Sequence, residues 1–472
     1  MREVYVLMRF DVEDYIARAT DSATLACANA LARRGLTGVF KVVGEYARRL
    51  VRDGRTDVLA SLHQHDLGYH TDWHSKPPTP AQYLAGMGWE EGVEEFVRRE
   101  APGVDDVRRV LGTDLSCYGQ PGGSWAPQVF GALPRLGIPA YLGRRSLVSS
   151  GGQPFHYCGL LNVAHLKHDI GSGFPLEDRQ YQDDLLQRVD QALDDGANPA
   201  GALVCLTCHP ARLALDGRDS DAENFRRAHD REPSRWVVPA LKSPAQARKA
   251  YAGFERVLDR LTGRADCHIV TMRDALELYR DRAKGKRFGS APMTRIAEAA
   301  RERVHFAQID GVWLSAAEML WLVCRAVTDQ SPGTAGPVCG PFLGPVNRVQ
   351  TKVTVADLAS PLLVQAASAT CAYMARQGRV PDQVHLGEHA TLSPGDFLAT
   401  VSGLLLEAPH AGRMPSRVRL AQGHEDWSDY INTEQARAAW DWVCLPEGFC
   451  SPGLYALAEL QCWSLKPAAL QA

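Results

Sequence analysis

The chain has 472 residues, too many for one average domain of about 150. Hydrophobic residues make up 45% and charged residues 23%, as in a folded globular protein. The net charge of −3 gives no indication of a nucleic-acid partner. No run approaches the ~20 apolar residues that cross a bilayer, and the N-terminus lacks the features of a signal peptide. We therefore expect a cytoplasmic protein with no membrane partner, whose twelve cysteines are reduced thiols.

The first 280 or so residues alternate β-rich and helical runs, which favours parallel β/α units with active residues at the carboxyl ends of strands. The expected strands are 4–10, 39–43, 58–62, 140–142, 201–207 and 268–271. The expected helices are 24–34, 46–52, 90–99, 182–193 and 246–261.

A basic, turn-rich stretch at 281–293 interrupts this alternation and indicates a domain boundary. We expect residues 1–285 to form an α/β domain and residues 286–472 a smaller, mostly helical accessory domain of unknown role. Within the second part, the Gly/Pro-rich residues 331–345 are expected to form an ordered loop or a linker. Residues 314–320 and 392–398 share a helix-capping pattern, which favours two similar caps over an internal repeat.

Two histidines four residues apart, His70 and His74, follow the expected strand 58–62. On a helical turn this spacing places both imidazoles on one face, within reach of one metal ion. Many such pairs are surface residues, but a position after a strand favours a metal site in an α/β fold.

Three acidic residues, Asp11, Glu13 and Asp14, come at the end of the first expected strand. Carboxylates this close repel one another unless a positive charge lies among them. A helix N-terminus, whose dipole attracts acids, is a reasonable alternative for Asp14. It suits Asp11 less well, because Asp11 follows the strand so closely.

His209 ends the apolar run 201–208. Together with Cys205 and Cys208 it spells the C-x-x-C-H pattern of covalent haem attachment. Haem is not expected, because the pattern lies in a β-rich segment of a chain without an export signal. Another candidate is the tight turn 119–125, which can bring free backbone N–H groups and an aromatic wall to a pocket.

Taken in chain order, these segments resemble the motifs of the polysaccharide deacetylase superfamily (NodB-like, carbohydrate esterase family 4) over roughly residues 1–280. The matching segments are the acidic residues 10–14, in the Asp-Val-Glu-Asp form of one branch, the His-Thr-x-x-His of 70–74, the turn 119–123, and 206–209. The resemblance implies a distorted (β/α)7 NodB-like barrel with one divalent metal ion.

Transferred by position, the resemblance makes His70 and His74 metal ligands. The acidic ligand is Glu13 or Asp14, of which the spacing in this branch favours Glu13. Imidazole and carboxylate ligands suit zinc, and also cobalt, nickel, iron or manganese.

The same resemblance assigns the proton transfers. Asp11 would be the general base that activates water, and His209 the general acid that protonates the leaving amine. The backbone N–H of Gly122 would stabilise the oxyanion, with Pro121 and Trp125 beside the substrate.

One departure from the family pattern concerns the third motif, where the family has an arginine that orients the base and this chain has Gly119 or Gln120. Asp169 is one of several carboxylates that could support His209. An inactive site that only binds is compatible with this departure. The arginines that could replace the missing cation are Arg9, Arg108 and Arg144.

Residues 354–407 of the second part have a short similarity to pseudomurein-binding repeats, and no other family is recognised there. Aromatic residues follow, which would form either a sugar-stacking surface or core. They are Trp427, Tyr430, Trp440 and Trp442.

The sequence thus predicts a metal-dependent enzyme that hydrolyses a C–N bond, with deacetylation of an N-acetylated amino sugar or glycan as the first choice. Hydrolysis of another linear or cyclic amide, ureide or imide is the alternative within enzymes, since a cytoplasmic chain does not meet a cell-wall substrate. A non-catalytic carbohydrate-binding or scaffold protein is the alternative outside enzymes. An oligomer is compatible with the sequence.

Overall fold

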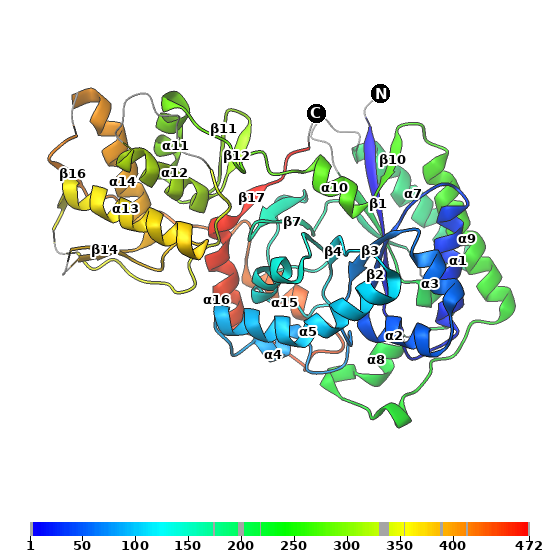
Figure 1. The fold of residues 1–472 in the computed structure, drawn as a ribbon. Helices are drawn as coiled ribbons and strands as arrows, with labels where there is room; N and C mark the ends of the chain where they lie inside the picture. The colour runs from blue at the N-terminus through cyan, green and yellow to red at the C-terminus, as the bar shows by residue number, and fades with distance from the viewer. Residues whose placement is uncertain are drawn as a thin grey trace.

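The computed structural model describes residues 3–172, 175–196, 203–217, 219–329, 339–353, 355–387, 390–411 and 414–470. An α/β part with one curved sheet lies beside a mostly helical part (Figure 1). This arrangement confirms the predicted fold class. The domain boundary near residue 285 stays a prediction, and residues 331–338 of the expected loop lie outside the described residues. Among the helices that the structure describes, none has the length and apolar character needed to cross a bilayer.

One 11-stranded sheet forms the centre of the α/β part. Its strands are β1 (Val4–Val12), β2 (Val39–Val42), β3 (Asp66–Tyr69), β4 (Cys117–Tyr118), β5 (Ala140–Leu142), β6 (Phe155–Tyr157), β7 (Leu160–Val163), β8 (Asp169–Ser172), β9 (Leu203–Cys208), β10 (Cys267–Val270) and β17 (Lys466–Pro467). The order is β17-β6-β7-β5-β4-β3-β2-β1-β9-β8, and β10 also pairs with β1. Within the described residues β17 and β8 end the order without pairing with each other, so the barrel is open.

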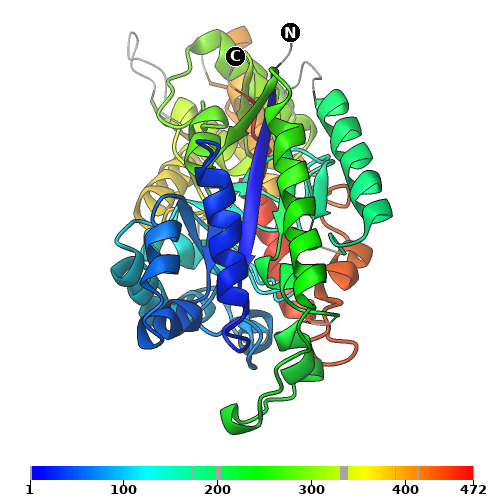
Figure 2. The same ribbon diagram turned by 90° about the vertical axis from the view of Figure 1, so that its right-hand side faces the viewer.

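Helices alternate with the strands of this sheet along the chain. They are α1 (Thr20–Ala32), α2 (Gly44–Arg52), α3 (Thr56–Leu62), α4 (Pro80–Leu84), α5 (Trp89–Leu111), α6 (Gln128–Ala132), α7 (Arg179–Gly196), α8 (Ser220–Asn224), α9 (Pro244–Thr262) and α10 (Met272–Leu278). Figure 2 shows α1 and α9 side by side along the long strand β1.

The alternation of side chains along β1 and β2 separates a packed face from a polar one. Phe10 of β1 stacks on Phe40 of β2 with ring centroids 4.4 Å apart, and Phe254 of α9 meets Phe10 edge-on at 6.0 Å. The next residues along the strands, Asp11 and Lys41, point to the opposite face and are direct neighbours in the parallel register. The outer face is therefore held by aromatic packing, while the inner face carries charge.

One strand prediction was wrong. Residues 58–62 belong to the helix α3, and the strand that leads to the histidines is the next segment, β3. Val58 and Leu62 are both buried and lie four residues apart, which is the spacing of one helix face. A short apolar run does not distinguish a strand from a buried helix by its pattern alone.

The helical part contains the same order of elements twice. The first set is α11 (Ser290–Glu302), β11 (Ala307–Ile309), β12 (Val312–Leu314) and α12 (Ala316–Thr328). The second set is α13 (Ser360–Gln377), β14 (Val384–Leu386), β15 (Ala390–Leu392) and α14 (Pro394–Ala411), with β13 (Asp357–Ala359) and β16 (Arg417–Arg419) paired at its edge. Each set is helix, antiparallel hairpin, helix. The structure therefore favours an internal repeat over two similar caps.

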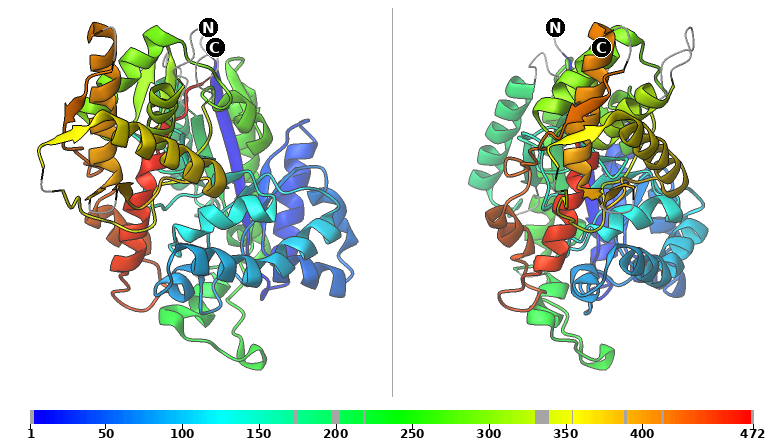
Figure 3. Two further views of the ribbon diagram at one scale, coloured as in Figure 1. Left: turned by 60° about the vertical axis from the view of Figure 1, so that its left-hand side comes forward. Right: turned by 90° about the vertical axis from the view of Figure 1, so that its left-hand side faces the viewer.

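The last segment of the chain returns to the α/β part. After α15 (Thr433–Trp440), helix α16 (Pro452–Gln461) lies between the helical part and the barrel (Figures 1 and 3), and β17 pairs with β6. The buried Lys466 ammonium lies 2.8 Å from Asp281 and 2.7 Å from Glu318. This cluster joins three segments that are far apart in the sequence.

Candidate metal centre

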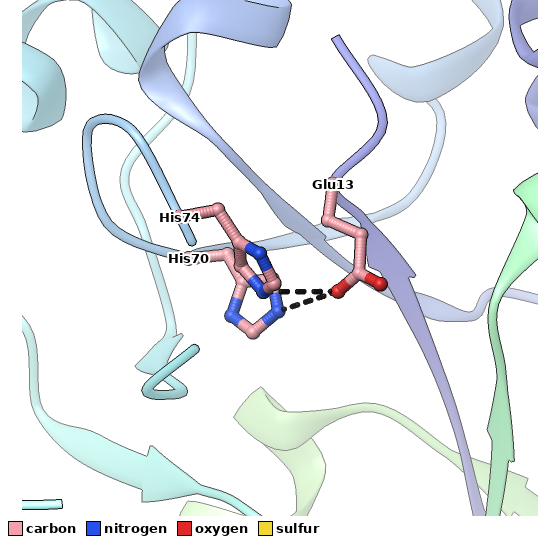
Figure 4. Close-up of side chains that lie close together, drawn as sticks. All are labelled: Glu13, His70 and His74. Carbon is pink, nitrogen blue, oxygen red and sulfur yellow. Dashed lines mark hydrogen bonds and ion pairs between the residues drawn. The ribbon is translucent and has the colours of Figure 1, made fainter. Parts of the chain in front are cut away.

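Glu13, His70 and His74 meet at the carboxyl edge of the sheet. Glu13 follows β1 and His70 follows β3, and the Nε2 atoms of His70 and His74 lie 3.3 Å and 3.0 Å from the same Glu13 oxygen, Oε2. Figure 4 shows both imidazoles directed at this carboxylate. The three potential ligand atoms lie within 4.8 Å of one another, which is compatible with one shared ion.

The two histidines do not lie on a helical turn as the spacing predicted. Residues 70–74 form a loop in which Thr71 (φ +65°) and His74 (φ +49°) are left-handed. The Thr71 carbonyl accepts a hydrogen bond from Gly44 N (3.0 Å) at the start of α2, outside the loop itself. The loop brings the two rings to a centroid distance of 4.6 Å by its two positive φ angles instead of by helical periodicity.

Hydrogen bonds fix the orientation of both rings. His70 Nδ1 donates to the Gly119 carbonyl (2.7 Å), so its Nε2 carries the lone pair that faces Glu13. His74 Nδ1 donates to Ser75 Oγ (2.7 Å), which itself donates to Asp221 Oδ2 (2.7 Å). This leaves a lone pair on His74 Nε2 as well.

The donor set fits a divalent metal ion. His74 Nε2 is buried without a hydrogen-bond partner in the described structure, as expected of a ligand atom. Burial lowers the pKa of His70 to about 4, and the nearby Lys41 charge acts in the same direction, so this ring stays neutral at physiological pH. Burial alone would raise the pKa of Glu13, but His74 and His209 outweigh it and hold the pKa well below its usual value. Burial would lower the pKa of His74, but the neighbouring Glu13 carboxylate outweighs it and raises that pKa. Imidazole and carboxylate groups are typical ligands of zinc and similar ions.

Asp14, the alternative acidic ligand, is turned away from the histidines. Its Oδ1 accepts hydrogen bonds from the backbone N–H groups of Ile16 (3.0 Å) and Ala17 (2.8 Å), and its Oδ2 accepts one from the Ser220 hydroxyl (2.7 Å). Burial raises its pKa to about 6. The geometry thus favours Glu13. Asp14 stabilises the turn that follows β1 and does not lie at a helix N-terminus, because α1 begins only at Thr20.

Lys41 is the cation beside Asp11, a partner that the sequence pattern did not indicate. Its Nζ lies 3.0 Å from Asp11 Oδ1, and both side chains are buried. A Cβ atom at Gly119 would collide with the Lys41 ammonium, and one at Gly68 would lie 2.9 Å from Lys41 Cγ. Gly119 and Gly68 therefore leave room for a lysine from β2. Burial would raise the pKa of Asp11, but Lys41 and the neighbouring His70 hold it below its usual range.

Two of the three arginines expected as replacements, Arg9 and Arg144, line the same cavity as Asp11. Arg9 pairs with Asp169 at 3.4 Å and also helps to lower the pKa of Asp11, whereas Arg144 is exposed and Arg108 donates to the Leu136 carbonyl (2.8 Å). Asp169 also accepts a hydrogen bond from the Thr207 hydroxyl (3.0 Å). Asp169 therefore interacts with Arg9 and Thr207 in the described structure, and not with His209.

His209 lies on the open side of the carboxylates. Its Nε2 is 3.7 Å from Asp11 Oδ2 and 3.8 Å from Glu13 Oε1. The side chain is 29% exposed and lines a cavity of about 470 Å³ that also contains Asp11, Glu13 and both metal-site histidines. His209 is thus the least buried of these groups and the one placed to meet a molecule that enters.

The aromatic wall of this cavity comes from Trp442 and not from Trp125. A Cβ atom at Gly122 would collide with the Trp442 ring, which also meets the His74 ring edge-on at 6.0 Å. Gly122 lines the cavity, whereas Trp125 and Pro121 do not. Trp125 is a buried core residue, since its side chain is only 1% exposed.

The other C-terminal aromatic residues have mostly structural positions. Trp427 and Trp440 are buried, and the Trp440 indole N–H donates to the Trp125 carbonyl (3.0 Å). Tyr430 is half-buried and packs on Phe306 with ring centroids 5.2 Å apart. The expected sugar-stacking surface is therefore reduced to Trp442, while its neighbours anchor the segment that carries it.

Glu100 of α5 holds the loop of residues 70–74 in place through hydrogen bonds. Its Oε2 accepts hydrogen bonds from the Asp72 backbone N–H (2.8 Å) and the Tyr69 hydroxyl (2.7 Å), and burial raises its pKa to about 7. A raised pKa means that the folded state binds this proton more tightly than the unfolded state. The free energy of unfolding should therefore fall as pH rises from about 4.5 to 7, by up to about 3 kcal/mol.

We expect Glu100→Gln to remove this part of the pH dependence while keeping an acceptor for both hydrogen bonds. Urea unfolding from pH 4.5 to 8 measures it. Glu91→Gln, an exposed position on the same helix, is the matched control and should behave as wild type. Parallel stability curves for wild type and Glu100→Gln would contradict the expectation.

Comparison with known proteins gives matches among solved structures alone. No family model matches the chain, and no curated protein sequence matches it. A structure from Mycobacterium smegmatis named as a polysaccharide deacetylase is 14% identical, with 58% of this chain and 90% of that chain covered and a TM-score of 0.38. A family 4 acetyl xylan esterase from Clostridium thermocellum, in complex with cobalt, is 13% identical over 58% and 91%, with a TM-score of 0.32.

A CE4 family pseudoenzyme from Bacillus anthracis is 12% identical over 44% of this chain and 56% of that chain, with a TM-score of 0.27. These solved structures carry the family name that the motifs suggest. At such identities and TM-scores the chemistry of the site has to be inferred from its own geometry.

Proposed function

We propose that the protein is a metal-dependent hydrolase of the polysaccharide deacetylase (NodB-like) family that removes the acetyl group from an N-acetylated amino sugar or glycan. The observation that carries the proposal is the convergence of His70 Nε2 and His74 Nε2 on one oxygen of Glu13, with Asp11 and His209 beside it. The residues proposed as ligands and as proton-transfer groups all line one cavity, which supports the proposal.

Each residue has a chemical task in this proposal. Glu13, His70 and His74 would hold the metal, which supplies a Lewis acid that polarises the acyl oxygen and acidifies water. Asp11 stays ionised because Lys41 lies against it, and it accepts the proton of the attacking water. His209, the exposed partner, donates a proton to the departing amine nitrogen.

The test combines metal analysis with acetate release. Purified protein, as isolated and after loading with zinc, cobalt, nickel, iron or manganese, is incubated with a panel of N-acetylated sugars. One equivalent of metal and release of acetate are expected. If the protein hydrolyses cyclic ureides or imides but no N-acetylated sugar, its substrate is a cyclic amide and not a sugar. If the protein binds a sugar but releases no acetate with any of these metals, the proposal that it is an enzyme is contradicted.

Lys41 should behave as a positioning residue that acts through Asp11. Lys41→Met removes the charge that holds the pKa of Asp11 low, so that pKa should rise and the acidic limb of the pH–rate profile should move to higher pH. A misplaced base should also lower kcat by up to about 100-fold. Metal content should stay unchanged, since Lys41 offers no ligand to the cluster.

A double variant separates this role from a general loss of structure. In the Asp11→Asn background, Lys41→Met should produce little further loss, because both changes act on the same group. A lower kcat with an unmoved pH profile would assign Lys41 a merely structural role.

A further inference from the structure

Three arginines surround the entrance side of the cavity that holds the candidate metal centre. Arg144 and Arg145 follow β5, and Arg226 begins the short turn Arg226–Ala228 after α8. All three line the same cavity as Glu13 and His70. None of them belongs to the ligand set or to the proton-transfer pair of the proposed function.

The remaining cations of the cavity already have carboxylate partners. These pairs are Arg9 with Asp169 (3.4 Å), Lys41 with Asp11 (3.0 Å) and Arg212 with Asp219. Their positive charge is therefore balanced within the protein, and they are unavailable for a ligand.

Arg144 and Arg226 differ from those paired cations. Both are exposed, and in the described part of the chain no carboxylate oxygen lies within 4.0 Å of either guanidinium. Arg145 is half-buried and donates a hydrogen bond to the backbone carbonyl of Asp441, a neutral acceptor. Burial lowers the pKa of Arg145 and the like charge of Arg144 acts in the same direction, while the Asp441 carboxylate opposes them. A divalent ion in the cavity would add further positive charge.

The turn that carries Arg226 is held in place by the C-terminal segment. The backbone N–H groups of Arg227 and Ala228 donate to the carbonyls of Val443 (2.8 Å) and Cys444 (3.1 Å). Arg227 (φ +56°) and Ala228 (φ +58°) are both left-handed, a conformation that persists only where surrounding contacts impose it. The position of the turn that carries Arg226 is therefore fixed by tertiary contacts with the C-terminal segment.

We propose that the substrate carries an anionic group, a carboxylate or a phosphate monoester, in addition to the acyl amide, and that Arg144 and Arg226 bind it, with Arg145 beside them. The proposal rests on the proposed function and specifies its substrate class. A guanidinium presents a planar fork of N–H donors that matches both oxyanions. Arg144 and Arg226 have no carboxylate partner among the described residues, and an anionic ligand in the cavity would supply one.

The experiment compares N-acetylglucosamine with two anionic relatives, its 6-phosphate and N-acetylmuramic acid, on the metal-loaded protein. At least one anionic sugar should have a higher kcat/KM than the neutral one, and the more favoured of the two identifies phosphate or carboxylate as the anion. The Arg144→Ala/Arg226→Ala variant should raise KM for that sugar roughly tenfold or more, while the neutral sugar keeps its KM. Arg227→Ala, next in the chain but outside the cavity lining, is the matched control.

A binding measurement separates this proposal from the proposed function. Titration calorimetry with the 6-phosphate and with N-acetylmuramic acid, in the Asp11→Asn background, reports affinity without turnover. Arginine-dependent binding in a protein that hydrolyses no sugar would sustain the anion site and reject the deacetylase. Equal kcat/KM for neutral and anionic sugars, with affinity unchanged by the double variant, would reject the anion site and leave the deacetylase standing.

Discussion

Replacing His74 with alanine should abolish stoichiometric metal binding and, with it, all turnover. The three proposed ligand atoms belong to Glu13, His70 and His74, so the variant would retain only two of them. Changes to groups that merely orient a ligand lower metal affinity about 10–100-fold, and loss of a direct ligand should exceed that range. Metal content by mass spectrometry after dialysis, and titration with zinc or cobalt, measure the effect.

Graded controls sharpen this prediction. Ser75→Ala removes the hydroxyl that orients His74 and should weaken metal binding by only about 10–100-fold. His268→Ala, an exposed histidine outside the cavity lining, should have no effect. Addition of metal should raise the melting temperature of wild type and leave His74→Ala unchanged, because only the protein that binds the ion is stabilised by it. Full metal loading of His74→Ala would refute the centre.

Asp11→Asn and His209→Ala should retain the metal and lose turnover, each by about 100- to 10,000-fold, the range for one proton-transfer group. The two losses should differ in their dependence on substrate. A general acid matters less when the departing amine is already weakly basic, so His209→Ala should recover activity on N-acetyl anilides with electron-withdrawing substituents. Asp11→Asn should not recover, since water still has to lose its proton.

Steady-state rates on a series of such anilides, with metal content measured in each sample, provide the comparison. A slope against amine pKa that is steeper for His209→Ala than for wild type is expected. Equal slopes for the two proteins would remove His209 from the role of acid, and unimpaired turnover in Asp11→Asn would remove Asp11 from the role of base.

Much of the site was visible in the sequence because its residues lie directly at strand ends. Glu13 at the end of β1 and His209 at the end of β9 follow apolar runs, and parallel strands bring their carboxyl ends to one edge. The histidine pair was found for the same reason, although the expected helical turn was wrong. Four-residue spacing is shared by a helix and by this loop, and only the left-handed Thr71 and His74 distinguish them.

Lys41 illustrates what the pattern did not reveal. A lysine inside the short strand Val39–Val42 is visible in the sequence, but its meaning depends on the register that sets it opposite Asp11. It also depends on two glycines in neighbouring strands, Gly68 and Gly119, that leave space for its side chain. Register and available volume are properties of packed strands and not of any one segment.

By itself the sequence determined the α/β class, the order of the motifs and the identity of the residues at the strand ends, because strand and helix periodicity are local properties of the chain. Only the tertiary structure decided which carboxylate faces the histidines, which cation holds Asp11 and which tryptophan walls the cavity. Trp442 reaches Gly122 across more than three hundred residues of chain, through a C-terminal segment anchored by buried contacts. Contacts between segments so far apart arise from complementary shape and charge on folding, and a local pattern does not encode them.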